Sequence, residues 1–231
     1  MKAIFRENRI TSPNMSVSIL MSGPIRPSED AVLDVIQSIR SQFPGCKIFL
    51  STWTDSEEVR KAVDVYQTVP EPTEEDVCRV VTTRTIQQRQ LNLSDTTPGC
   101  KISTYRMFYG VECVCKLATP YLQPDSKVIR IRTDSVFEFD PDYLTSLLTL
   151  PSNTYVTKDG DGFDFFALTT FKHLVTTWTF PNLNAYNQHI DSSWNPENAV
   201  RRRVPVPLHY LDPAKVKIYI LRENKRKHYF N

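Results

Sequence analysis

The chain has 231 residues, of which 40% are hydrophobic and 23% charged, so it can fill the core of a folded α/β domain. Its formal net charge of +2 is too small to favour nucleic acid as the main partner. Residues 1–8 carry charges where a secretory signal needs an apolar run, and no stretch approaches the ~20 apolar residues of a membrane span. We therefore expect a soluble cytoplasmic protein. It would act in a bacterial cytoplasm, or in the host cytoplasm if a virus encodes it.

Five cysteines are present, an odd number, and their spacing matches no Cys-x-x-Cys zinc pattern. They are Cys46, Cys78, Cys100, Cys113 and Cys115. We expect reduced thiols in a reducing compartment.

The first part of the chain alternates strand and helix signals, as an α/β fold requires. An apolar strand over residues 16–23 ends at a glycine. Ser28 is then placed to cap a helix whose apolar residues recur at helical spacing as far as residue 43. A second strand covers residues 47–53. This strand–helix–strand unit predicts parallel strands joined by a right-handed crossover.

Downstream, strand and helix signals continue to residue 221, which predicts one α/β domain over residues 1–231. Its central sheet is expected to be mixed and mostly parallel, Rossmann-like, and flanked by helices. A loop is expected over residues 92–100. The predicted helices are 56–62, 103–118, 140–148, 170–178 and one starting at 195. The predicted strands are 63–66, 127–132, 154–157, 165–168, 204–208 and 216–221.

Polar residues follow three of the predicted strands, at residues 22–24, 51–53 and 132–134. Ligands bind beyond the carboxyl ends of the strands in open α/β sheets, so these segments predict a nucleotide pocket. Gly23 allows the backbone to approach a ligand closely. Trp53 offers either a stacking face for a base or ordinary core packing.

Asp134 lies on the turn after a buried strand, where a carboxylate can hold a divalent cation between two phosphates. A neighbouring arginine can supply the same positive charge through bidentate contact with phosphate. The alternative is an aspartate that only caps the turn before Ser135.

Several runs resemble, in order, segments of the WavE-like lipopolysaccharide-synthesis and related capsular glycosyltransferases. Residues 129–134 resemble their R-x-R-T-D segment, and residues 19–24 resemble a first strand that ends in Ser-Gly-Pro. Residues 43–53 resemble their F-P-x-x-x-I-x-L-S-T-W second strand. Shorter similarities occur at 105–110, 164–168, 196–197 and 220–222.

The resemblance implies a GT-A fold, with a donor half over about residues 16–134 and an acceptor half with a C-terminal tail over about 135–231. It also implies a nucleotide-diphosphate sugar donor, a glycan or glycoconjugate acceptor, and Mn²⁺ or Mg²⁺ at Asp134. The usual Asp-x-Asp motif reads Arg132-Thr133-Asp134 here, so only its second acid remains. The expected donor-binding residues are Ser22, Gly23, Pro24, Arg26, Thr52, Trp53, Tyr105, Arg130, Arg132, Thr133 and Asp134.

An inverting transferase needs a carboxylate base for the acceptor hydroxyl. Asp164, before an apolar strand, is the first candidate and Asp161 the second, and both can instead be turn formers. His209 and His228 are candidate metal ligands, although a surface histidine is the commoner case. The basic runs 201–203 and 222–227 are either solvated faces or contacts to diphosphate, an anionic glycan or a membrane surface.

Two other functions compete with sugar transfer. A sugar nucleotidyltransferase usually carries a glycine-rich phosphate loop with a lysine, whereas this chain has Ser22-Gly23-Pro24-Ile25-Arg26 and only 6 glycines. The missing first acid also allows a non-catalytic carbohydrate- or nucleotide-binding module. The sequence identifies neither the base and sugar of the donor, nor the particular acceptor, nor whether the configuration is retained or inverted, nor the oligomeric state.

Overall fold

The computed structural model describes residues 17–73, 75, 98–159, 165–180, 200–222 and 225–228, and for residues 98–103, 222 and 225–228 only the backbone is described. Within these ranges, no helix has the length and apolar character needed to cross a membrane.

A seven-stranded central sheet has the strand order β3-β2-β1-β4-β7-β6-β8. Strand β1 pairs with β2 on one side and β4 on the other, both parallel, and β7 is antiparallel to β4. The sheet is therefore mixed and mostly parallel, as the sequence predicts. Its strands are β1 (Ser18–Ser22), β2 (Lys47–Thr52), β3 (Val65–Thr68), β4 (Lys127–Arg132), β6 (Tyr155–Thr157), β7 (Phe166–Thr170) and β8 (Leu208–Tyr210).

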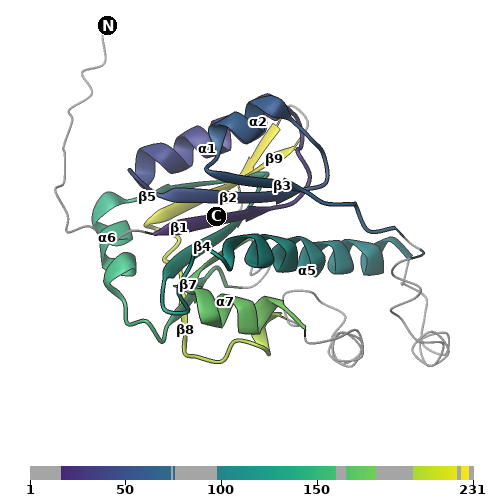
Figure 1. The fold of residues 1–231 in the computed structure, drawn as a ribbon. Helices are drawn as coiled ribbons and strands as arrows, with labels where there is room; N and C mark the ends of the chain where they lie inside the picture. Colours follow the sequence, from purple (N-terminus) through teal and green to yellow (C-terminus); the bar gives the residue numbers. More distant parts are fainter. Residues whose placement is uncertain are drawn as a thin grey trace, which may run out of the picture.

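Helices cover both faces of the central sheet (Figure 1). Helices α1 (Glu29–Gln42) and α2 (Glu57–Ala62) lie over one face, and α5 (Pro98–Ala118) and α7 (Phe171–Trp178) lie over the other. The two-residue period of the strands sends alternate side chains into two cores. Ile19, Ile48 and Ile129 belong to one, and Leu20, Phe49 and Val128 to the other. The predicted fold class is confirmed.

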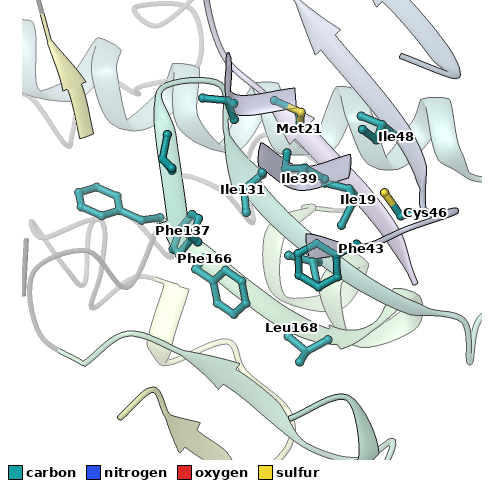
Figure 2. Packing of buried hydrophobic residues seen from close by; sticks show 14 of the residues in the cluster. Ile19, Met21, Ile39, Phe43, Cys46, Ile48, Ile131, Phe137, Phe166 and Leu168 are labelled. Carbon is teal, nitrogen blue, oxygen red and sulfur yellow. The ribbon is translucent and has the colours of Figure 1, made fainter. Parts of the chain in front are cut away.

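The core on the α1 side continues into a second sheet, with the order β10-β9-β5. It contains β5 (Ser135–Phe139), β9 (Val216–Arg222) and β10 (Lys225–His228). Figure 2 shows Phe137 of β5 beside Phe166 of β7, with ring centroids 5.0 Å apart. This aromatic contact joins the second sheet to the central one.

The sequence predicts neither β5 nor β10. Only Thr133 and Asp134 separate β5 from β4, so no turn signal of ordinary length marks its start. Strand β10 has the sequence Lys-Arg-Lys-His and shows no apolar alternation. It is a strand because it pairs with β9, which is a tertiary effect.

Several predicted boundaries are wrong by a few residues. Helix α5 begins at Pro98, inside the predicted loop 92–100, because proline is well suited to a first helical turn. Strands β3, β7 and β8 begin one to four residues after their predicted starts. The predicted helix start at residue 195 lies outside the described residues.

Three cysteines with described side chains, Cys46, Cys113 and Cys115, are buried free thiols. Burial raises the pKa of all three, and that of Cys115 to about 12. They are therefore protonated and unreactive at neutral pH, in agreement with the expected reduced thiols. The side chains of Cys78 and Cys100 lie outside the description.

The helix cap that the sequence predicts at Asp140 can be tested in helix α6 (Pro141–Thr149). The Asp140 carboxylate caps it by accepting a hydrogen bond from Tyr143 N at 2.9 Å. We expect Asp140→Ala to lower the free energy of unfolding by about 1 kcal/mol in urea titrations, since a backbone N–H loses its partner. Asp140→Asn is the matched control and should stay close to wild type, because asparagine caps equally well. Equal losses in both variants would contradict a capping role.

Candidate functional site

The carboxyl ends of β1, β2 and β4 meet at one edge of the central sheet. Ser22, the last residue of β1, is in register with Ser51 of β2 and with Arg132 of β4. Gly23 N then donates to Ser51 O at 3.3 Å, and Thr133 Oγ1 donates to Pro24 O at 2.6 Å. The polar segments at 22–24, 51–53 and 132–134 are therefore brought together.

Gly23 is required by the shape of this edge. Its φ angle of +133° lies in the region that favours glycine. A Cβ at this position would also sit 3.0 Å from Thr133 Oγ1. The loop after β1 can therefore lie directly against the turn after β4 only with glycine here.

Arg26, Asp134 and Arg132 form an ion-paired cluster at this edge, named here the Arg26–Asp134–Arg132 cluster. Arg132 contacts the Asp134 carboxylate in a bidentate manner, with Nε 2.9 Å from Oδ1 and Nη2 2.8 Å from Oδ2. Arg26 Nε lies 3.1 Å from Oδ2. The side chain of Asp134 is 1% exposed, that of Arg132 17% and that of Arg26 43%. The carboxylate is thus buried while one guanidinium reaches solvent.

This arrangement does not fit a divalent metal at Asp134. Both carboxylate oxygens already accept guanidinium N–H groups, and a cation on them would lie beside two positive charges. In the described part of the chain, no group of three or more His, Cys, Asp or Glu side chains is placed to hold a metal ion. The expected Mn²⁺ or Mg²⁺ finds no ligand set among these residues.

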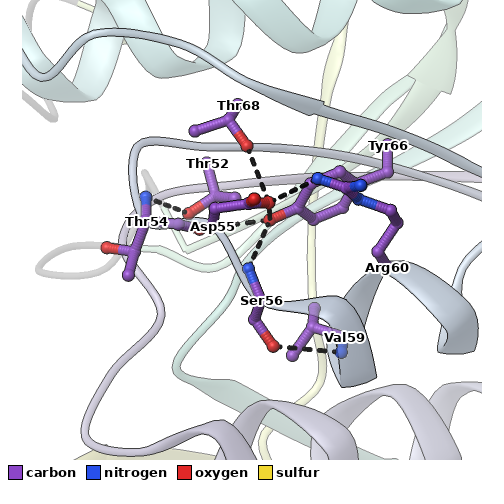
Figure 3. A network of polar contacts seen from close by, with 8 residues as sticks. All are labelled: Thr52, Thr54, Asp55, Ser56, Val59, Arg60, Tyr66 and Thr68. Atoms are coloured by element: carbon purple, nitrogen blue, oxygen red, sulfur yellow. Dashed lines mark hydrogen bonds and ion pairs between the residues drawn. The ribbon is translucent and has the colours of Figure 1, made fainter.

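The turn after β2 is held by Asp55, whose carboxylate accepts hydrogen bonds from Arg60 at 2.6 Å, Thr68 at 3.2 Å and the Tyr66 hydroxyl at 3.3 Å (Figure 3). The hydrogen bond from Arg60 is the main reason that the pKa of Asp55 is lowered. Thr52 is fully buried, and its Oγ1 accepts from Thr54 N at 3.3 Å. Thr52 thus shapes the turn that carries Trp53.

Trp53 follows β2 and packs on helix α5, and Tyr105 is a residue of that helix. A Cβ built at Gly110 would sit 3.3 Å from the Trp53 ring and 3.6 Å from Ser22 Cβ, so the helix packs closely on the indole. Tyr105 is half-buried and stacks on Tyr109, with centroids 6.0 Å apart. The indole is therefore partly used for packing, at the same edge as the arginine cluster.

Arg130 is placed differently from the other expected donor-binding residues. Its side chain is 2% exposed, and its register partners Leu20 and Ala167 belong to the core on the α5 and α7 side of the sheet. The guanidinium lies 4.5 Å from the Trp178 ring, a cation–π contact. The structure thus puts Arg130 in a core, behind the edge where Arg132 emerges.

Asp161 and Asp164, the candidate bases, lie outside the described residues. Phe165, which follows Asp164, holds its ring 4.9 Å from the Arg132 guanidinium. Strand β7 begins at the next residue, and Phe166 is in register with Ile131 near the carboxyl end of β4. The chain that follows Asp164 therefore enters the sheet at the candidate site.

Neither candidate histidine ligand supports a metal site at Asp134: His209 lies on another strand, and the side chain of His228 is not described. His209 lies on β8, with β7 and β6 between it and β4. Three strand spacings of about 4.8 Å separate β4 from β8 by roughly 14 Å. The backbone of His228 pairs with Tyr219 in the second sheet, and its side chain is not described.

The basic run 201–203 has structural partners. Arg203 donates to the carbonyl oxygens of Thr176, Thr177 and Thr179 and lies 4.0 Å from the Phe180 ring. It thereby satisfies carbonyl groups at the end of α7. Arg201 pairs loosely with Asp159 at 3.9 Å.

Sequence reasoning missed two residues that help to form the site. Phe165 supplies the ring beneath Arg132, and an aromatic residue directly after Asp164 was the available signal. Leu221 N donates to Asp134 O at 2.8 Å, which brings the end of β9 to the cluster. No sequence signal marks this pairing, because it joins residues 87 positions apart in the chain.

The sequence matches no known family profile, and no curated protein is similar to it in sequence. The resemblance to the WavE-like family is therefore not confirmed.

Solved structures show only distant similarity. The glycosyltransferase GlyE of Streptococcus pneumoniae TIGR4 is 11% identical over 85% of this chain, with a TM-score of 0.45, and the match spans 45% of that protein. Mouse xyloside xylosyltransferase 1 is 12% identical over 85% of this chain and 84% of its own, with a TM-score of 0.42. A Bacillus anthracis structure described as a glucose-1-phosphate thymidylyltransferase is 9% identical over 89% of both chains, with a TM-score of 0.49. Similarities this slight assign no function.

The buried carboxylate leads to a prediction about stability. Asp134→Asn keeps the shape but removes the negative charge between Arg26 and Arg132. We expect the free energy of unfolding to fall by about 1–3 kcal/mol, less than for a fully buried pair because Arg26 reaches solvent. Urea titration at neutral pH measures it. Asp125→Asn, at the exposed Asp125–Lys172 pair, is the control and should leave the midpoint unchanged. Equal midpoints for the two variants would show that the cluster is not stabilising.

Proposed function

We propose that this protein is a glycosyltransferase that moves a sugar from a nucleotide-diphosphate donor to a hydroxyl of a glycan or glycoconjugate. The observation that carries the proposal is the Arg26–Asp134–Arg132 cluster at the joined carboxyl ends of β1, β2 and β4. This edge is where open α/β sheets bind ligands, and arginine is well suited to phosphate. The resemblance of residues 19–24, 43–53 and 129–134 to sugar-transferring enzymes supports the same function.

In the proposed reaction, the donor diphosphate lies against the arginine cluster, next to the Gly23 loop. Asp164 takes the proton of the acceptor hydroxyl, and that oxygen bonds to the anomeric carbon. The bond from the anomeric carbon to the phosphate oxygen breaks, and its electron pair stays on the leaving nucleoside diphosphate. Arginine guanidinium groups offset that developing negative charge. Both arginines are anchored by the buried carboxylate of Asp134, so the guanidinium groups need to move little as charge develops on the leaving group.

A thermal-shift screen with UDP-, GDP-, dTDP- and ADP-sugars tests the proposal. Binding to the folded state alone stabilises it by about 2.7 kcal/mol at a ligand concentration 100 times Kd. We therefore expect one nucleotide class to raise Tm by several degrees, while the free sugars do not. The absence of a shift with every nucleotide sugar would overturn the proposed function.

A second test separates an enzyme from a binding module and concerns the base. With the donor found in the screen, release of the nucleoside diphosphate is measured in the presence of glycan acceptors. We expect Asp164→Asn to lower kcat on the order of 100-fold or more while the donor Kd is unchanged, because an amide takes up no proton. Asp161→Asn, at the second candidate base, is measured in parallel and should have a much smaller effect, whereas a larger loss there would assign the base to Asp161. If donor binding is normal but the wild-type protein releases no product, the protein is a binding module.

A further inference from the structure

We infer that Arg26 and Arg132 bind the donor diphosphate directly, in place of a divalent cation, and that Asp134 is a positioning residue that holds both arginines. This inference rests on the proposed function and specifies its donor site. It departs from the expectation of Mn²⁺ or Mg²⁺ at Asp134.

The first step concerns the carboxylate. An ionised carboxylate offers about four lone-pair sites, and at least three of those on Asp134 accept guanidinium N–H groups. A Mg²⁺ ion demands oxygen ligands at about 2.0–2.1 Å in near-ideal geometry. To bind one, Asp134 would have to give up its ion pairs, which are stronger in a buried setting than in water. Its chemistry is that of an anchor for arginine.

The second step concerns the two guanidinium groups. They arise from adjacent strands, Arg26 from the loop after β1 and Arg132 from the end of β4. The contacts with Asp134 fix both in place, and Phe165 lies against Arg132 on another side. The planar fork of donors on an arginine fits phosphate oxygens. The site thus has positive charge that is positioned before the ligand binds, which lowers the entropic cost of binding.

The third step concerns the C-terminal hairpin of β9 and β10. The hydrogen bond from Leu221 N to Asp134 O places the end of β9 beside the cluster. The next residue is Arg222, and the pairing register sets it opposite Lys225 of β10. The backbone therefore brings two further basic residues to the same region as Arg26 and Arg132. The side chains of Arg222 and Lys225 are not described, so the inference rests on Arg26 and Arg132, and the hairpin adds only the backbone position of two basic residues near them.

Isothermal titration calorimetry tests the inference with UDP, GDP, dTDP and ADP, each compared with its nucleoside, in buffer with EDTA and in buffer with MnCl₂. We expect the best diphosphate to bind equally well in both buffers. Arg26→Ala should weaken its binding in EDTA by about 10- to 100-fold, and Arg26→Lys by less, with nucleoside binding unchanged. Lys172→Ala is the control for loss of an exposed ion-paired cation. Lys172 lies at the start of α7, near the amino end of β4, and its variant should bind as the wild type does.

Asp134→Asn tests the positioning role and is measured well below its Tm. We expect weaker diphosphate binding with unchanged nucleoside binding, whereas a purely structural defect would weaken both. Diphosphate binding that requires MnCl₂ and is lost in EDTA would overturn the inference while leaving the proposed function intact. An unchanged Kd in Arg26→Ala would do the same. No binding of any nucleotide in either buffer would overturn both.

Discussion

The position of strand β1 at the middle of the central sheet is the constraint on which the rest of the structure depends. All five of its residues are buried, and it is hydrogen bonded in parallel to β2 and β4. A strand buried on both faces must be apolar on both, and Ile19, Leu20 and Met21 meet this need. Because the three strands run in the same direction, their carboxyl ends and the polar residues that follow share one edge. The candidate site is a consequence of that alignment.

At this edge the main physical conflict is between burial and charge. Asp134 is almost fully buried, and a buried carboxylate is costly unless it is paired and hydrogen bonded. Arg132 and Arg26 meet that requirement, and they place cationic groups at the edge formed by the carboxyl ends of β1, β2 and β4. One arrangement therefore holds the turn between the two sheets and keeps an arginine at the surface of this edge, where the proposed donor would bind.

The second sheet also has two effects: it holds the Asp134 turn, and it fixes the C-terminal part of the chain beside that turn. Strand β5 follows directly after the Asp134 turn and carries Phe137 into the core. The turn is therefore held by a buried strand before it, β4, and by a second strand after it, β5. Strand β9 then pairs with β5 and donates a backbone hydrogen bond to Asp134. The C-terminal part of the chain is thereby fixed next to residues from its first and middle parts. The expected division into a donor half and an acceptor half is a proposal, and strands from both halves share one central sheet.

The sequence by itself determined the elements with strong local signals. The apolar runs of β1, β2 and β4, the Ser28 and Asp140 caps, and the parallel crossover from β1 to β2 all follow from short-range chemistry. The meeting of the β1 and β4 ends was expected from the general rule for parallel sheets, but the pairing itself is long-range. Only the tertiary structure decided that β5 and β10 are strands, that Arg130 faces a tryptophan in the core, and that Asp134 is held between two arginines. The physical reason is distance along the chain: Arg26 and Asp134 are 108 positions apart, and no local propensity specifies the partner of a charged group.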